Sequence, residues 1–123
     1  MRIKGHAIEP RATLGWARFR KADLRGADLR HAEMHNADLR QADLSEADLR
    51  GAILWGARLN GANLTKARLA YADLRDADLT DADLAEADLE NANLRNARVT
   101  EQQLELAASL AGATMPDGKR VQR

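Results

Sequence analysis

The chain contains no cysteine, has two prolines among its 123 residues, and is only 3% aromatic. Without cysteine, neither disulfide bonds nor thiolate metal sites are available to the fold. No apolar run approaches the length of a membrane span, and the N-terminus leads into no signal-peptide hydrophobic region, so we expect a cytoplasmic protein without membrane contact. Since 45% of the residues are nevertheless apolar, the interior must be narrow and aliphatic.

What the chain has in abundance is a strict five-residue period. Alanine occurs at every fifth position from Ala12 to Ala97, eighteen times in succession, and Leu, Met, Phe or Val follows two residues later, from Leu14 to Val99. An α-helix would spread residues five apart over all its faces, and a flat strand would place successive leucines on opposite faces. The chain must therefore turn a corner in every repeat, with Ala and Leu inside and the other three residues outside. We expect the resulting coils to stack through parallel ladder hydrogen bonds.

The recurring pattern Ala-Asp-Leu-Arg, as at residues 37–40, and Ala-Asp-Leu, as at residues 82–84, resembles the pentapeptide-repeat family. This resemblance implies an all-β solenoid, a right-handed, four-sided parallel β-helix in which four repeats make one coil. The repeats of residues 12–99 would then form about four and a half coils, a rod roughly 22 Å tall at the usual strand spacing. Because the family's motif encodes the fold and not a site, the resemblance transfers no catalytic or binding residue.

The five-residue grid stops after Val99, and we expect the remaining residues to close the C-terminal end of the rod. Thr-Glu-Gln-Gln at residues 100–103 matches a capping box, and the apolar spacing that follows predicts a capping α-helix over 100–111. Residues 112–123 are predicted to form a turn and a frayed tail. Residues 1–11 are predicted to be a degenerate edge strand or a flexible flank. We therefore expect a monomer, or a dimer through the N-terminal end if that end is open.

The repeat is most irregular where Ile53 replaces the usual Asp or Asn and Trp55 takes an outward position. Exposed Trp beside Ile is unusual on a soluble monomer, and Trp and Arg are favoured anchors of protein interfaces. Because positions twenty apart stack on a four-sided coil, these side chains share one side of the rod with other candidates. The predicted partner surface consists of Trp16, His35, Ile53, Trp55 and Arg75. The alternative is that Trp55 lies flat over Gly15 or forms a cation–π pair with Arg75.

Charge is unevenly distributed although the formal net charge is +0. Residues 1–25 carry seven basic and two acidic groups, whereas residues 71–91 carry eight acidic groups and one basic group. On a four-sided coil these acidic groups form a belt around one turn, which would attract a basic partner or serve only as solubilising charge. The predicted acidic belt consists of Asp73, Asp76, Asp78, Asp81, Asp83, Glu86, Asp88 and Glu90.

A filled solenoid offers no water-excluding pocket in its repeats, so we predict no enzyme, no catalytic residue and no cofactor. His31 and His35 would share a face only on a helix, and these residues are not helical, so no metal site is predicted there. Stacked carboxylates are expected to bond the turn backbone and adjacent arginines rather than a cation. Such stacks include Asp23 with Asp43 and Asp28 with Asp48. The basic groups of the first coils alternate with acidic ones and lack stacking aromatics, so nucleic acid is not an expected partner.

The sequence thus favours a non-enzymatic, bacterial, cytoplasmic scaffold whose protein partner is unknown. One alternative comes from the family resemblance, because some members bind DNA topoisomerases such as gyrase by imitating the DNA duplex. A short rod with a basic first coil and no net charge argues against that alternative. The other alternative is a structural module of a larger multidomain protein.

Overall fold

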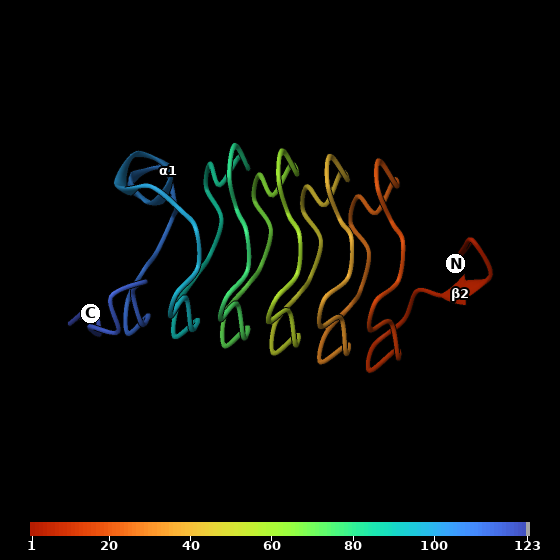
Figure 1. Cartoon of the computed structure of the whole chain (residues 1–123), viewed down its shortest axis with the longest axis horizontal. Coiled ribbons are helices and arrows are strands. Elements are labelled where there is room, and N and C mark those ends of the chain that lie inside the picture. The colour runs from red at the N-terminus through yellow and green to blue at the C-terminus, as the bar shows by residue number, and fades with distance from the viewer. Residues whose placement is uncertain (123) are drawn as a thin grey trace.

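The computed structural model describes residues 1–122, which wind around a single axis to form a rod with the two termini at opposite ends (Figure 1). Fourteen parallel bridges join residues twenty apart, from Thr13 with Glu33 to Asp78 with Arg98. Each coil therefore contains four repeats, as predicted. Because each bridge is one residue wide, the described residues contain only two short strands, β1 (Arg2–Ile3) and β2 (His6–Ala7), and one helix, α1 (Glu101–Glu105).

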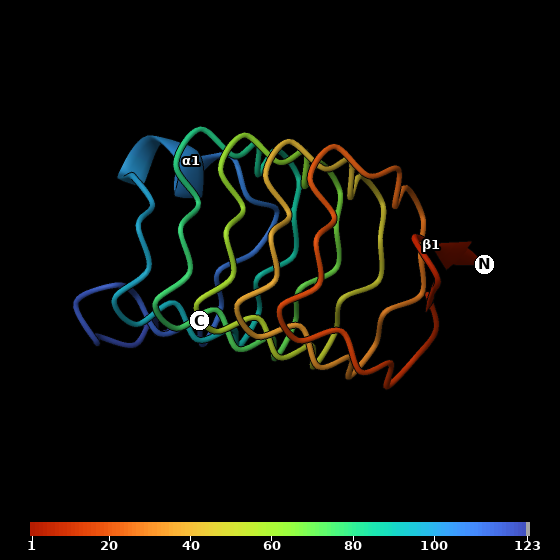
Figure 2. The same cartoon turned by 45° about the vertical axis from the view of Figure 1, so that its right-hand side comes forward.

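Each coil is held to the next by repeated backbone hydrogen bonds. The N–H of Leu64 donates to the carbonyl of Asp83 over 2.9 Å, and the N–H of Asp83 donates to the carbonyl of Ala62 over 3.0 Å. Within a repeat, the N–H of Ala67 donates to the carbonyl of Leu64 over 3.0 Å, and Lys66 between them has a φ of 59°. A positive φ at the third residue of a four-residue turn makes the chain change direction. The same corner recurs in every repeat, and Figure 2 shows the successive coils in register.

The interior consists of alternating alanine and large aliphatic side chains. At the inward grid positions, the alanines from Ala12 to Ala97 and the large apolar residues from Leu14 to Val99 are all buried except Ala22 and Val99, which are partly exposed. No polar or charged side chain is buried in the part of the chain that the structure describes. The predicted division of each repeat into two inward and three outward residues is therefore confirmed.

Helix α1 is shorter than the helix predicted over 100–111. It begins with the expected capping box, in which the side chain of Thr100 accepts from the N–H of Gln103, but it ends at Glu105. The chain then returns to the ladder, where Ser109 pairs with Asp88 and Thr114 with Asn93. The prediction fails because Ala-Ser-Leu at 108–110 and Ala-Thr-Met at 113–115 resume the repeat one residue out of phase. Leu110, Ala113 and Met115 then turn back towards the interior, although Ala108 is exposed.

Residues 119–121 are paired rather than frayed. Thr114 and Arg120 form an antiparallel bridge, and the N–H of Val121 donates to the carbonyl of Ala113 over 2.7 Å. The predicted frayed tail is therefore wrong here, because this segment satisfies backbone groups at the edge of the last coil. Residue 123 of that predicted tail lies outside the described residues.

At the N-terminal end, β1 and β2 form an antiparallel hairpin, which differs from both the single edge strand and the flexible flank expected for residues 1–11. Lys4 and Gly5 between the strands both have positive φ, as tight hairpin turns require. The rings of His6 and Phe19 pack in a T-shaped arrangement with centroids 5.4 Å apart, Ile3 of β1 packs against the core, and Ile8, directly after β2, is 6% exposed. The hairpin thus contributes apolar cover to the first coil.

Candidate functional site

The column that contains Trp55 holds two aromatic side chains, His35 and Trp55, between Gly15 and Arg75. The indole of Trp55 stacks on the imidazole of His35, with ring centroids 4.8 Å apart and planes inclined by 20°. His35 also covers Gly15, because a Cβ added at that glycine would collide with the imidazole. The alternative that Trp55 itself covers Gly15 is therefore wrong. Arg75 forms a bidentate ion pair with Asp73, at 2.8 and 2.6 Å, and within residues 1–122 the ring that stacks on Trp55 is that of His35.

The remaining candidates lie close to this stack. Trp16 occupies a corner with a φ of 63°, its N–H donates to the carbonyl of His35 over 2.9 Å, and its side chain is 70% exposed. Ile53 is partly exposed and bridges Glu33 and Asp73 in the ladder. The structure therefore joins His35 and Trp55 directly and places the other candidates on the same or the adjoining coils.

Five outward aspartates are held by an arginine two residues later. Asp38 accepts from Nε and Nη2 of Arg40 over 2.8 and 2.7 Å and from the Arg40 backbone N–H over 3.2 Å. Hydrogen bonding by the Arg40 side chain lowers the pKa of Asp38 to about 2, outweighing the opposite effect of burial. The same bidentate pair forms at Asp23–Arg25, Asp28–Arg30, Asp48–Arg50 and Asp73–Arg75. These aspartates thus bond turn backbone and arginine, as the sequence predicted.

Residues 1–122 contain neither a cluster of metal-binding side chains nor a membrane-spanning helix. No group of three or more His, Cys, Asp or Glu side chains there could hold a metal ion. No helix in that range is both long and apolar enough to cross a membrane.

The acidic belt surrounds the coil formed by residues 72–91, and its members differ in what they contact. Of the belt, Asp73 alone is in a salt bridge within the described chain. Asp78 accepts from the hydroxyl of Thr80 over 2.6 Å, and this hydrogen bond is the main cause that lowers its pKa. Asp88 accepts the backbone N–H of Glu90 over 3.0 Å. Most of the belt is therefore free to interact with an external cation.

A groove of about 500 Å³ beside Tyr71 was not predicted from the sequence. It lies where Gly51 and Ala70 interrupt columns of larger side chains. The signal was present in the repeat at residues 67–71, Ala-Arg-Leu-Ala-Tyr, which has Arg in the place of the usual Asp and Ala in the place of the preceding arginines. Such a local break in an otherwise regular pattern is typical of a functional or strained position.

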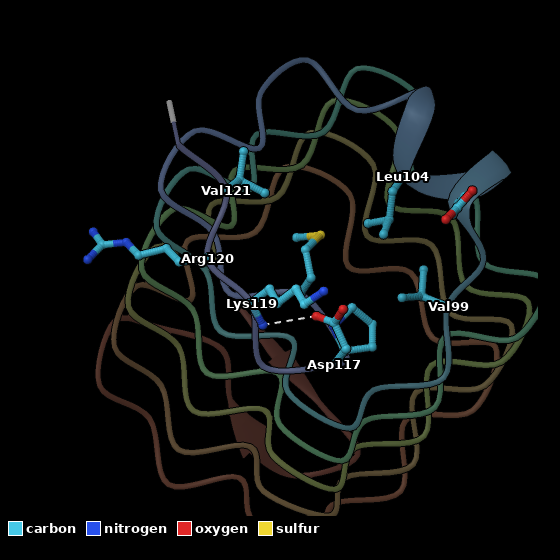
Figure 3. A pocket seen from close by; sticks show the side chains of 9 residues that line it. Val99, Leu104, Asp117, Lys119, Arg120 and Val121 are labelled. Atoms are coloured by element: carbon cyan, nitrogen blue, oxygen red, sulfur yellow. Dashed lines mark hydrogen bonds between the residues drawn. The ribbon is translucent and has the colours of Figure 1, made fainter.

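A second depression, of about 470 Å³, lies at the C-terminal end of the rod. Figure 3 shows Val99 and Leu104 on one side of it and Arg120 and Val121 on the other. The N–H of Lys119 donates to Asp117 over 2.9 Å at its rim. The C-terminal segment therefore covers this end incompletely.

Comparison with known proteins agrees with this architecture. The family model described as pentapeptide repeats matches residues 11–45, 42–81 and 72–105, with eight copies. A search of curated proteins found no match.

Among solved structures, a pentapeptide repeat protein from the Arabidopsis thaliana thylakoid lumen is 34% identical with a TM-score of 0.65, covering 79% of this chain and 63% of that one. This chain therefore spans less than two thirds of that protein. A pentapeptide repeat protein from Nostoc PCC 7120 is 35% identical with a TM-score of 0.58, covering 73% of this chain and 82% of that one. A plasmid-mediated fluoroquinolone resistance protein is 22% identical with a TM-score of 0.46, which is too remote to bear on function. The first two similarities confirm the predicted right-handed, four-sided β-helix.

Proposed function

Because this chain belongs to the pentapeptide-repeat family, whose proteins are generally structural or binding modules, we propose that it is a non-enzymatic scaffold that binds another protein. The proposed contact is the aromatic face, which we define as Trp16, His35, Ile53, Trp55 and Arg75. The filled interior, with no buried polar side chain in residues 1–122, supports a role in binding rather than catalysis. A cytoplasmic location remains a prediction.

The observation that carries this proposal is where the few aromatic residues lie. The chain has two Trp, one Tyr and one Phe, and only Phe19 is buried in the core. Trp16, Trp55 and Tyr71 are 70%, 38% and 70% exposed. A fold that packs aliphatic side chains around its axis does not need these aromatics for stability, whereas protein interfaces favour them.

The His35–Trp55 stack also prepares the surface for binding. Since His35 is held between Gly15 and the indole, both rings have a fixed orientation before a partner arrives. Less side-chain freedom is then lost on association, where each immobilised side chain costs about 0.5–1.5 kcal/mol. Binding through the stack therefore costs less side-chain entropy than binding through the flexible charged side chains around it.

The test uses a variant that restores the regular repeat. Ile53→Asp with Trp55→Arg converts residues 52–56 into Ala-Asp-Leu-Arg-Gly, which the chain already contains at 22–26 and 47–51. We expect this variant to fold, because Asp and Arg at these positions form a bidentate pair elsewhere on the rod. Wild type and variant would be compared by affinity capture from a lysate of the source organism, with mass spectrometry.

A protein captured by the wild type and lost with the repeat-restored variant supports the aromatic face. Circular dichroism and the melting temperature verify that the variant is folded. Equal recovery of the same proteins by both forms would show that this face is not the contact.

The topoisomerase-binding alternative requires a long anionic rod. This chain has a net charge of +0, and its first 25 residues carry seven basic groups. No observation therefore favours that alternative over the scaffold, and none favours a structural module of a larger protein.

A further inference from the structure

The groove beside Tyr71 lies on a corner where four coils stack and where the regular Asp–Arg pairing is interrupted. In the two coils nearest the N-terminus, Asp28–Arg30 and Asp48–Arg50 form ion pairs of 2.7 Å each. In the fourth coil, the residue two positions after Asp88 is Glu90, where the first two coils have arginine. Neither the Asp88 nor the Glu90 carboxylate is in a salt bridge within residues 1–122. Two adjacent carboxylates here therefore have no guanidinium of the kind that accompanies Asp28 and Asp48.

The third coil lies between the arginine-containing coils and the fourth coil, and its residues explain why a groove forms here. Arg68 stands in the place of the usual aspartate, and its Nη1 lies 3.8 Å from Oδ2 of Asp48, towards the N-terminal side. Ala70 stands where Arg30 and Arg50 stand in the earlier coils, so the volume of an arginine side chain is missing. The groove of about 500 Å³ includes this gap.

Nine residues line the groove, and three of them are arginines. Arg30 and Arg50 are ion-paired with Asp28 and Asp48, and Arg68 lies towards Asp48. The lining charges without a salt bridge within residues 1–122 are therefore the carboxylates of Asp88 and Glu90.

Tyr71 is 70% exposed, and His31 lies so close to Gly51 that a Cβ there would collide with the imidazole. Ala70 and Gly51 are the two small residues of the lining. Tyr71, Asp88 and Glu90 line the same groove, and the backbone N–H of Tyr71 donates to the carbonyl of Glu90 over 3.0 Å. A planar group that enters the groove therefore has an aromatic ring and two carboxylates available to it.

We propose that this groove binds an arginine side chain from a basic segment of the partner protein. A guanidinium forms bidentate hydrogen bonds with carboxylates and stacks on aromatic rings, which matches Asp88, Glu90 and Tyr71. Arg30 and Arg50 show that guanidinium groups fit this corner of the rod. The acidic belt attracts such a segment over a longer range. An acidic segment would instead be repelled by the carboxylates of Asp88 and Glu90 in the fourth coil.

This inference rests on the proposed role as a protein-binding scaffold and adds the chemistry of the partner. The decisive variant is Glu90→Arg, which restores Asp-Leu-Arg at 88–90 and supplies the missing guanidinium from the chain itself. The matched control is Glu86→Arg, which makes the same charge change at an exposed corner position of the belt outside the groove. Tyr71→Ser removes the aromatic wall without changing charge.

The probe is a phage-displayed library of random heptapeptides, selected on wild-type protein and depleted on the Glu90→Arg variant. Enriched peptides would be synthesised and measured by fluorescence anisotropy at near-physiological salt. We expect enriched peptides to contain arginine and to bind Glu90→Arg and Tyr71→Ser about tenfold or more weakly than wild type, as loss of an interface anchor produces. Glu86→Arg should weaken binding by less than about threefold, as a screened surface charge does.

Failure to enrich arginine-containing peptides would overturn the inference. Equal weakening by Glu86→Arg and Glu90→Arg would also overturn it, because general attraction to the belt would then account for binding. Melting curves verify that each variant is folded. These results concern the groove alone. The aromatic face is tested separately by the Ile53→Asp, Trp55→Arg variant, so failure of one proposal can be distinguished from failure of the other.

Discussion

Gln103 joins helix α1 to the coil beneath it, so Gln103→Glu tests how the C-terminal end is closed. Its Oε1 accepts from the backbone N–H of Thr100 over 2.8 Å, which completes the capping box. Its Nε2 donates to the carbonyls of Leu79 and Ala82 over 2.7 and 2.9 Å. In the coil below, the carbonyl of Ala62 accepts instead from the backbone N–H of Asp83. The Gln103 side chain therefore replaces a ladder hydrogen bond that the helix interrupts.

Glutamate at this position retains the acceptor of the capping box but loses both donors. Each lost hydrogen bond is expected to cost about 1 kcal/mol, and a carboxylate facing two carbonyl oxygens adds an unfavourable interaction. We therefore expect Gln103→Glu to lower the free energy of unfolding by about 2–4 kcal/mol at neutral pH. Thr100→Ala, which removes only the cap, should lower it by about 1 kcal/mol.

Urea denaturation followed by circular dichroism measures both values. Because the end of a solenoid can unfold separately, hydrogen exchange of the amide of Ala108 should be measured as well. That amide donates to the carbonyl of Ala87 over 2.7 Å and should exchange faster in the glutamate variant. If Gln103→Glu were as stable as wild type to within about 0.5 kcal/mol, the assigned bonds to Leu79 and Ala82 would not be stabilising.

Three further predictions test the interior, the ion pairs and the aromatic stack. Leu64→Asp should prevent stable folding, because Leu64 is 0% exposed and an unpaired buried charge costs several kcal/mol; an unchanged melting temperature would contradict its inward position. The pKa of Asp38 is lowered to about 2 by Arg40, from an ordinary value near 3.8, so its stabilising effect is present above about pH 4 and is lost as pH falls towards 2. The melting temperature of Asp38→Asn should therefore fall less than that of wild type over this range, and parallel curves would refute the pairing. Gly15→Ala should displace His35, alter the near-ultraviolet circular dichroism and cost about 0.5–1.5 kcal/mol, whereas an identical spectrum would show that the stack does not need glycine there.

Most of the fold could be predicted because the residue types within each repeat determine which side chains point inward and where the chain turns. Ala62 and Leu64 point inward and Lys66 turns the corner through contacts within five residues and one neighbouring coil. The C-terminal end was predicted less well. The repeat resumes at Ala108 and Ala113, one residue later than the five-residue grid of Ala12 to Ala97 would place them. Extending that grid along the sequence therefore does not identify these two repeats.

The candidate surfaces could be predicted only in part. Irregular repeats in the sequence indicated the aromatic face, and the periodicity placed His35 and Trp55 in one column. Which ring would cover Gly15 depended on how the side chains turn relative to the axis, and the structure assigns that place to His35. The groove beside Tyr71 is formed by residues of four stacked coils, and a single repeat does not show it.

The sequence by itself determined the period of five, the inward and outward positions and the uneven charge, because these depend on residue types at fixed short spacing. The family resemblance added the number of sides per coil. Only the tertiary structure decided how the ends are covered and which outward side chains meet. Those contacts join residues about twenty positions apart or more, such as Gln103 with Ala82 and Trp55 with His35. Their formation depends on side-chain volume and direction across coils, which no local pattern specifies.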